Sequence, residues 1–357
     1  MVAWRETVAQ LRDARAEYTR RVRRHVRRAL EFGLRPHLLG RRITHVHGPR
    51  HVEYGPQELL VQTVVRNGAL YVHSFMDHYG ELGVVHHVFL DNGSTDDTVA
   101  RLCAYPNVTV LHSDVPYAKY ENTMKRYLAE RFSAGRWNLC ADIDELFDYP
   151  SSDRLTLTAL IAYLNARGFT AVIAQMLDMY SDGPLLAVAS TAEDRLKDKY
   201  QYYDLSAVEP RPYQWSAPSR PAIKMHWGGV RRSVFGTNNG LTKAALVRID
   251  GRVRPFVEWH QATGAIIADF TCVLRHYPFV GSFRDKVLDA ARTGRYGTTT
   301  TDEYIAYARA LTTDPNLSLM GPGTRRFSAV DELVNAGFLV VSDEYCRWVR
   351  ERGLPAS

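Results

Sequence analysis

The stretch at residues 137–150, WNLCADIDELFDYP, decides the fold because it joins an apolar run to a cluster of acids. The run at 137–141 predicts a short buried strand. Side chains alternate along a strand, so Asp142 and Asp144 are expected to project to the same side, with Glu145 beside them. Two converging carboxylates repel each other unless a cation lies between them, and oxygen ligands suit Mg²⁺ or Mn²⁺ bound together with substrate phosphates. The alternative is a solvated acidic turn.

The composition is that of an ordinary globular protein. The chain has 357 residues, of which 45% are hydrophobic and 24% are charged. No apolar run approaches the ~20 residues that a membrane span needs, and the start of the sequence lacks the apolar region of a secretory signal. Four well-separated cysteines without a C-x-x-C pair indicate free thiols in a reducing compartment. We therefore expect a cytoplasmic location.

The positive charge is concentrated near the start of the chain. Residues 1–50 hold 13 arginines and four acids, a net charge of +9, against +6 for the whole sequence. Residues 3–33 show an apolar stripe at helical spacing with arginines on the other faces, and residues 1–56 are interpreted as a basic helical arm with its connector. Three interpretations remain open for the arm: a docked helix with a solvated basic face, peripheral contact with an anionic membrane, or nucleic-acid binding. The near-neutral remainder argues against a nucleic-acid-binding protein as a whole.

Apolar runs then alternate with helix-like segments. The predicted strands are 59–65, 84–90, 108–111 and 137–141, and the predicted helices are 69–81, 97–104 and 117–132. This order predicts an α/β fold with a parallel sheet covered by helices. Ligands of such sheets bind beyond the carboxyl ends of the strands. Polar side chains follow three of the predicted strands: Arg66 and Asn67, Asp91 and Asn92, and Asp142 and Asp144.

These motifs together resemble those of GT-A fold glycosyltransferases, specifically family 2-like proteins. They read VVRNGA (64–69), FLDNGSTDDT (89–98) and LCADIDELF (139–147). The resemblance implies a Rossmann-like, mixed but mainly parallel sheet flanked by helices, with residues 57–150 as the nucleotide-sugar-binding half. It implies that Asp142 and Asp144 hold a divalent cation bridging the donor diphosphate, and that the nucleotide sugar is bound by Arg66, Asn67, Asp91, Asn92 and Asp142. Gly68 departs from the family pattern, which has a glutamate there.

Residues 151–300 are expected to form the acceptor-binding and catalytic half, and residues 301–357 a helical closing segment. Related GT-A enzymes often use a late histidine as the third metal ligand and a following lysine at the diphosphate, which the resemblance assigns to His276 and Lys286, with His260 as the rival ligand. Imidazole beside two carboxylates favours Mn²⁺ over Mg²⁺. Residues 184–225, rich in Tyr and Pro, are expected to be irregular, either as an acceptor-binding insert or as a packed loop.

The preferred hypothesis is a metal-dependent, inverting glycosyltransferase that moves a sugar from a nucleotide-diphosphate sugar to a hydroxyl of a glycan, lipid-linked or small-molecule acceptor. Inversion needs a carboxylate base, and Glu258 is preferred over Asp178, Asp182 and Asp269. Two alternatives remain. One is a degenerate, non-catalytic GT-A module that still binds a nucleotide sugar. The other is a sugar nucleotidyltransferase, whose Gly-rich basic loop after the first strand is absent from RNGALY.

Overall fold

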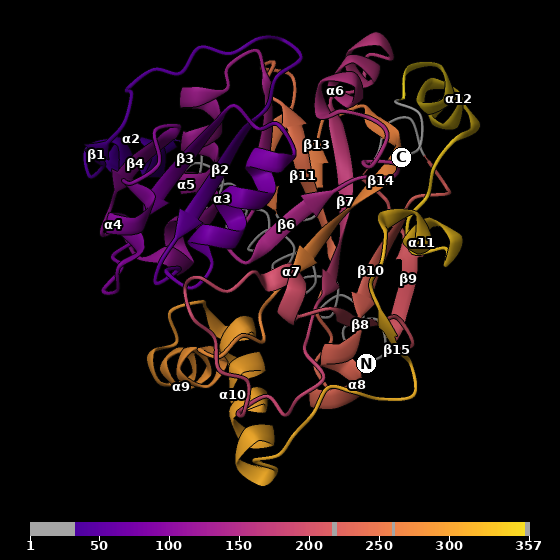
Figure 1. The fold of residues 1–357 in the computed structure, drawn as a ribbon. Coiled ribbons are helices and arrows are strands. Elements are labelled where there is room, and N and C mark those ends of the chain that lie inside the picture. Colours follow the sequence, from indigo (N-terminus) through magenta and orange to yellow (C-terminus); the bar gives the residue numbers. More distant parts are fainter. Residues whose placement is uncertain (1–32, 216–219, 259–260, 354–357) are drawn as a thin grey trace, which may run out of the picture.

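A nine-stranded sheet forms the centre of the computed structural model, which describes residues 33–215, 220–258 and 261–353. The predicted basic helix falls almost wholly outside these residues. In spatial order the strands are β1 (Thr44–His47), β4 (Val108–His112), β3 (His86–Asp91), β2 (Leu60–Val65), β5 (Trp137–Cys140), β11 (Thr242–Arg248), β7 (Ala171–Asp178), β14 (Ile267–His276) and β6 (Glu145–Asp148) (Figure 1).

The sheet is mixed but mainly parallel. Strands β2, β3, β4 and β5 are parallel to one another, and β7 is parallel to β14. Strand β11 lies between β5 and β7 and is antiparallel to both. The six strands β2, β3, β4, β5, β7 and β14 therefore all point the same way, opposite to β11. The edge strands β1 and β6 are antiparallel to their neighbours. This arrangement confirms the predicted α/β fold class, a mixed, mainly parallel sheet flanked by helices.

Helices cover both faces of the sheet because its central strands are apolar on both sides. Phe89 of β3 packs against Phe75 of α3, whereas its neighbour Leu90 lies in a separate core cluster with Leu128 of α5. The helices are α2 (Arg35–Gly40), α3 (Val72–Glu81), α4 (Thr98–Leu102), α5 (Tyr117–Phe132), α6 (Leu157–Ala166), α7 (Leu196–Lys199), α8 (Val230–Phe235), α9 (Phe283–Thr293), α10 (Thr298–Thr313), α11 (Val330–Asn335) and α12 (Asp343–Arg352).

Three two-stranded sheets complete the fold. They pair β8 (Tyr202–Asp204) with β15 (Thr324–Arg326), β9 (Val208–Pro212) with β10 (Lys224–Gly228), and β12 (Arg254–Glu258) with β13 (Gln261–Thr263). The expectation of an irregular segment at 184–225 is therefore wrong in part, because α7, β8 and β9 lie within it. Among the described residues, no helix is long and apolar enough to cross a membrane.

Candidate active site

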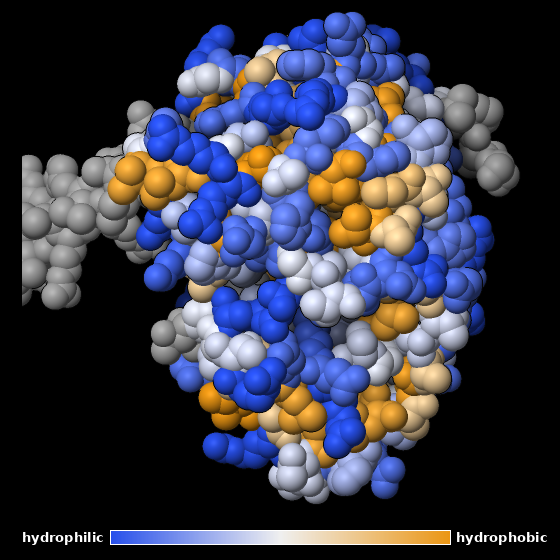
Figure 2. All heavy atoms as spheres, turned by 90° about the vertical axis from the view of Figure 1, so that its left-hand side faces the viewer, coloured by the Kyte–Doolittle hydropathy of each residue, from blue (hydrophilic) through white to orange (hydrophobic). Residues whose placement is uncertain are grey.

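A cleft of about 1010 Å³ opens at the carboxyl ends of β2, β5 and β14. The strand ends form one wall, and α9 and α10 form the other. Figure 2 shows this side of the molecule, where hydrophilic side chains surround a hollow between its upper and lower parts. The cleft is large enough for a nucleotide sugar, since ligand pockets typically measure about 300–1,000 Å³. Its lining includes most of the predicted site residues: Arg66, Asn67, Asn92, Asp142, Asp144, His276 and Lys286.

The acidic triplet lies in a turn between β5 and β6. The backbone N–H of Glu145 donates to the carbonyl oxygen of Asp142 at 2.9 Å, and the Glu145 carboxylate accepts from the backbone N–H of Asp142 at 3.0 Å. Asp142 and Asp144 both face the cleft, as expected, but strand alternation is not the reason. The reason is the turn, which reverses the chain immediately after β5 so that β6 can pair with β14.

Two lysines neutralise Asp142. Lys125 of α5 lies 3.1 Å from Oδ1 of Asp142, and Lys243 of β11 lies 2.9 Å from Oδ2. Lys243 also donates to the buried carboxylate of Glu145. Burial alone would raise the pKa of Asp142, but the two ammonium groups outweigh it and lower that pKa to about 2. Both carboxylate oxygens of Asp142 therefore already have a cationic partner.

Asp144 has a different set of partners, on the side of the cleft formed by β14 and α9. Lys286 donates to its Oδ2 at 3.1 Å, and Nε2 of His276 lies 3.6 Å from the same oxygen. Burial would raise the pKa of Asp144, but Lys286 and His276 hold it well below its usual range. Burial would likewise lower the pKa of His276, yet Asp144 and Asp178 keep that pKa raised.

Asp178, at the end of β7, orients His276. Its Oδ1 lies 2.6 Å from Nδ1 of His276, and Arg231 donates to both of its carboxylate oxygens at 2.7 and 2.8 Å. Nδ1 of His276 also lies 2.8 Å from a guanidinium nitrogen of Arg231, and Nε2 is the nitrogen directed at Asp144. Burial opposes ionisation of Asp178, but Arg231 and His276 lower its pKa to about 2.

Asp144 and His276 are the residues that could hold a divalent cation. Oδ1 of Asp144 has no hydrogen-bond partner within the described residues, whereas both oxygens of Asp142 are paired with lysines. A carboxylate that fixes the far nitrogen of a histidine, as Asp178 does, is the usual support of a histidine ligand. No group of three His, Cys, Asp or Glu side chains suited to a metal occurs in the described part. A cation held by two side chains would need substrate oxygens to complete its coordination.

The loop after β2 is braced by the loop after β3. Asn67 has a positive φ of 52°, and its side-chain oxygen accepts from the backbone N–H of Thr95 at 2.8 Å. Its own N–H donates to Ser94 at 2.9 Å. Arg66 is exposed beside it and lines the cleft, with no ion pair among the described residues. These bonds fix the backbone next to Arg66, whose guanidinium is available to a ligand in the cleft.

Asp91 and Asn92 differ from what the resemblance implies. The carboxylate of Asp91 accepts from the backbone N–H groups of Gly93 and Ser94 and from His112, and Asp91 is not among the cleft-lining residues. It shapes the turn, and the structure does not place it against a nucleoside. Asn92 lines the cleft, although its amide nitrogen donates to backbone carbonyls on the β4–α5 connection.

Gly68 stands where the family has an acid because the position has no space for a side chain. A Cβ there would lie 2.9 Å from Cγ2 of Val65 and 3.1 Å from Cγ1 of Ile143. Ile143 belongs to the acidic turn, so the absence of a side chain at Gly68 allows this turn to pack closely against the loop after β2.

Glu258, predicted to be the catalytic base, is the last residue of β12, and its side chain is not among those that the structure describes. Strand β11 is antiparallel to β5, and its last residue, Arg248, pairs with Trp137 at the amino end of β5. Val253, just before β12, packs with residues at the amino ends of β7 and β14. Strand β11 therefore carries the chain to the opposite edge of the sheet before β12 begins, and the role of Glu258 as the base stays a prediction.

The other acids proposed as the base also have other contacts or positions. Asp178 is held by Arg231, and Asp269 accepts from the hydroxyl group of Tyr163 at 2.8 Å. Asp182 is exposed but is not a lining residue of the cleft. His260, the rival metal ligand, lies outside the described residues.

Sequence reasoning did not find the α9–α10 wall of the cleft. Asp285, Asp289, Arg295, Tyr296 and Tyr304 all line it. The usable signal was the position of Asp285 and Asp289 four residues apart, on one face of a helix that also carries the predicted Lys286.

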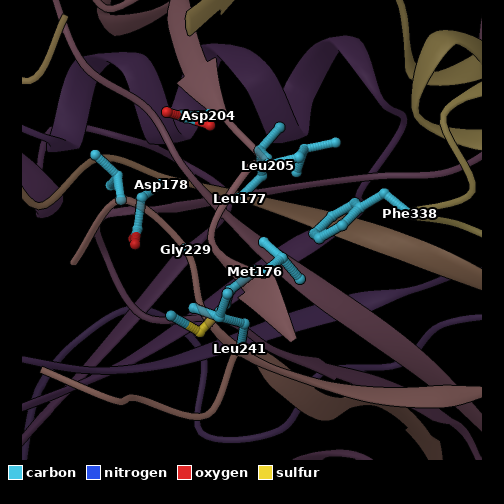
Figure 3. A pocket seen from close by; sticks show the side chains of 10 residues that line it. Met176, Leu177, Asp178, Asp204, Leu205, Gly229, Leu241 and Phe338 are labelled. Atoms are coloured by element: carbon cyan, nitrogen blue, oxygen red, sulfur yellow. The ribbon is translucent and has the colours of Figure 1, made fainter. Parts of the chain in front are cut away.

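A second, much smaller void has Asp178 among its lining residues, as Figure 3 shows. Its lining includes Leu177, Leu205, Leu241 and Phe338, and it measures about 10 Å³. That space holds a single water molecule at most, so it is not a ligand site.

Comparisons with known proteins give weak similarities. No protein-family model and no curated sequence matches the chain. Among solved structures, a glucosyl-3-phosphoglycerate synthase from Mycobacterium tuberculosis, in complex with Mn²⁺, UDP and glucosyl-3-phosphoglycerate, aligns at 15% identity and a TM-score of 0.24. This alignment covers 37% of this chain and 52% of the synthase. A 4-diphosphocytidyl-2C-methyl-D-erythritol synthase aligns at 13% identity and a TM-score of 0.22, over 35% of this chain and 62% of that enzyme. The chain thus spans about half to three-fifths of the length of these proteins.

Proposed function

We propose that this protein is a glycosyltransferase that moves a sugar from a nucleoside-diphosphate sugar to an acceptor hydroxyl. The observation that carries the proposal is the convergence of Asp144, His276 and Lys286 with Arg66 and Asn67 in one cleft at the carboxyl ends of the sheet. Two side chains that can hold a divalent cation, together with a lysine and an exposed arginine, are the groups that suit a nucleoside diphosphate.

Each group has a distinct part in donor binding. Arg66 and Asn67 face the nucleoside end of the donor, and Lys286 donates to the diphosphate. Asp144 and His276 hold Mn²⁺ or Mg²⁺, which stabilises the negative charge that develops on the leaving diphosphate. Lys243 and Lys125 keep Asp142 ionised beside the diphosphate site.

The test is donor binding to the full-length protein, followed by detection of transfer. Thermal shift and titration calorimetry with UDP-glucose, UDP-galactose and GDP-mannose, with and without Mn²⁺, should identify one donor whose binding is strengthened by the metal. Asp144→Asn should remove the effect of the metal, whereas Asp302→Asn, which removes an exposed acid of α10 outside the cleft lining, should not. Failure of every donor to bind the wild type would contradict the proposal.

The products distinguish this function from its alternatives. A glycosyltransferase releases nucleoside diphosphate from the donor, whereas a nucleotidyltransferase consumes a nucleoside triphosphate and releases pyrophosphate. Binding of a donor without either product would indicate a non-catalytic module.

A further inference from the structure

One wall of the cleft takes part in donor binding, as proposed above, only through Lys286. It consists of α9, α10 and the loop between them, which lie side by side at the end of the cleft opposite to Arg66 and Asn67 (Figure 1). Gly294 and Gly297 flank this loop with positive φ angles of 60° and 85°, and the loop carries Arg295 and Tyr296 into the cleft. Because the donor occupies the strand ends in the proposed function, this wall faces the acceptor.

The cations of this wall are already paired. Lys286 donates to Asp144 at 3.1 Å, and Arg295 donates to Asp289. Lys286 is assigned to the donor diphosphate, so an anionic acceptor would have to compete with Asp289 for Arg295. It would also carry its own desolvation cost to a wall whose cleft-lining side chains comprise three acids and two bases: Asp285, Asp289 and Glu303, and Lys286 and Arg295.

Asp285 is different from the other acids of the wall. Asp289 is bound by Arg295, and Glu303 lies 3.4 Å from Arg231. Asp285 is exposed, lines the cleft directly before Lys286, and has no hydrogen bond or ion pair within the described parts of the chain. Its carboxylate is therefore free to accept a hydrogen bond from a ligand hydroxyl.

Aromatic rings line the cleft in the same wall as this carboxylate. The rings of Tyr296 and Tyr304 are stacked with centroids 5.4 Å apart, and Tyr296 meets Tyr117 of α5 edge-on at 5.7 Å. Sugars present apolar C–H faces together with hydroxyl groups, so an aromatic surface next to a free carboxylate complements them. A phosphate or carboxylate group would instead face Asp285 with like charge.

We infer that the acceptor is a neutral, hydroxyl-rich molecule, a saccharide, and that Asp285 binds the attacking hydroxyl and takes its proton. This inference rests on the proposed function. In the step, the acceptor oxygen forms a bond to the anomeric carbon of the donor. The bond from that carbon to the diphosphate oxygen breaks, its electron pair leaves with the diphosphate, and the hydroxyl proton passes to the carboxylate of Asp285.

The experiment compares acceptors and variants with the full-length protein and the donor found by calorimetry. Transfer is measured to methyl glucoside and maltose, and to glucose 6-phosphate and 3-phosphoglycerate as anionic acceptors. The neutral sugars should be used with a kcat/KM at least tenfold higher. Asp285→Asn should lower kcat about 100-fold or more, the range of a lost general base, and should leave the donor Kd within twofold. It should also reduce the discrimination against the phosphorylated sugar, since the like charge is gone.

Asp302→Asn is the matched control, because it removes an equally exposed aspartate from α10 outside the cleft lining; its kcat should equal that of the wild type. Donor binding combined with a preference for anionic acceptors, or with full activity of Asp285→Asn, would overturn the inference and leave the proposed function standing. Absence of donor binding to the wild type would overturn both.

Discussion

A buried histidine makes the stability of this protein depend on pH well above the range in which carboxylates titrate. His87 is the second residue of β3, its side chain is fully buried, and neither ring nitrogen has a hydrogen-bond partner in the described structure. Its ring packs against Phe75, Tyr79 and Phe89. Burial, with a smaller contribution from His86, lowers the pKa of His87 to about 3. The perturbation that tests this reasoning is His87→Phe.

The magnitude follows from linkage. The unfolded chain binds a proton at His87 with a pKa near 6.5, whereas the folded chain does so only near 3. The stability from the neutral ring is therefore fully present above about pH 6.5 and is lost as the pH falls toward 3. At pH 5.5, protonation of His87 stabilises the unfolded state relative to the folded state by about 1.4 kcal/mol. Phenylalanine has no ring nitrogens to protonate, so His87→Phe removes this pH-dependent loss of stability.

Urea unfolding followed by tryptophan fluorescence at pH 7.5 and 5.5 measures the effect. Between these two pH values, wild type should lose about 1.4 kcal/mol more stability than His87→Phe. The variant should match or exceed the stability of wild type at pH 7.5, because phenylalanine suits the ring cluster and removes an unpaired N–H group. His51→Gln, at an exposed position, is the control and should follow wild type. Parallel pH dependences of wild type and His87→Phe would refute the reasoning.

Three further predictions concern the cleft. Lys125→Met should lower the free energy of unfolding by about 3 kcal/mol, since it leaves buried carboxylates with one cation fewer; a loss under about 1 kcal/mol in urea unfolding would argue against a buried network. Gly68→Ala should cost about 1–3 kcal/mol by overpacking against Ile143, and an unchanged Tm would contradict this. Lys286→Met should weaken binding of the nucleoside diphosphate by about tenfold or more with the fold retained, as the loss of one charge-assisted hydrogen bond requires; calorimetry showing an unchanged Kd would exclude a phosphate contact.

The strand and helix order of the first half could be predicted because each element there carries its own local signal. Helix α5 was predicted at 117–132 and is observed at Tyr117–Phe132. Strand β2 was predicted at 59–65 and is observed at Leu60–Val65. Parallel β-α-β units bring successive strand ends to one edge of the sheet by their topology alone, so Arg66, Asn67 and the acidic turn could be expected near one another.

The second half was harder to predict because its contacts are distant in sequence. Strand β6 begins within the acidic triplet and pairs with β14, so that Glu145 lies opposite His276. Lys243 reaches Asp142 across 101 residues of sequence. The direction of β11 decides to which edge of the sheet the chain runs before β12. This direction cannot be predicted from the alternation of apolar residues, since a strand has the same period in either direction.

The charged network explains how two acids separated by one residue take different parts. The turn at 142–145 points Asp142 toward α5 and β11, where Lys125 and Lys243 pair with its two carboxylate oxygens. It points Asp144 toward β14 and α9, where one oxygen is unpaired and His276 faces it with the nitrogen that Asp178 leaves free. The same D-x-D spacing therefore supplies one acid whose charge is balanced within the protein and one that is available to a ligand, and the distinction comes from neighbouring elements rather than from the motif itself.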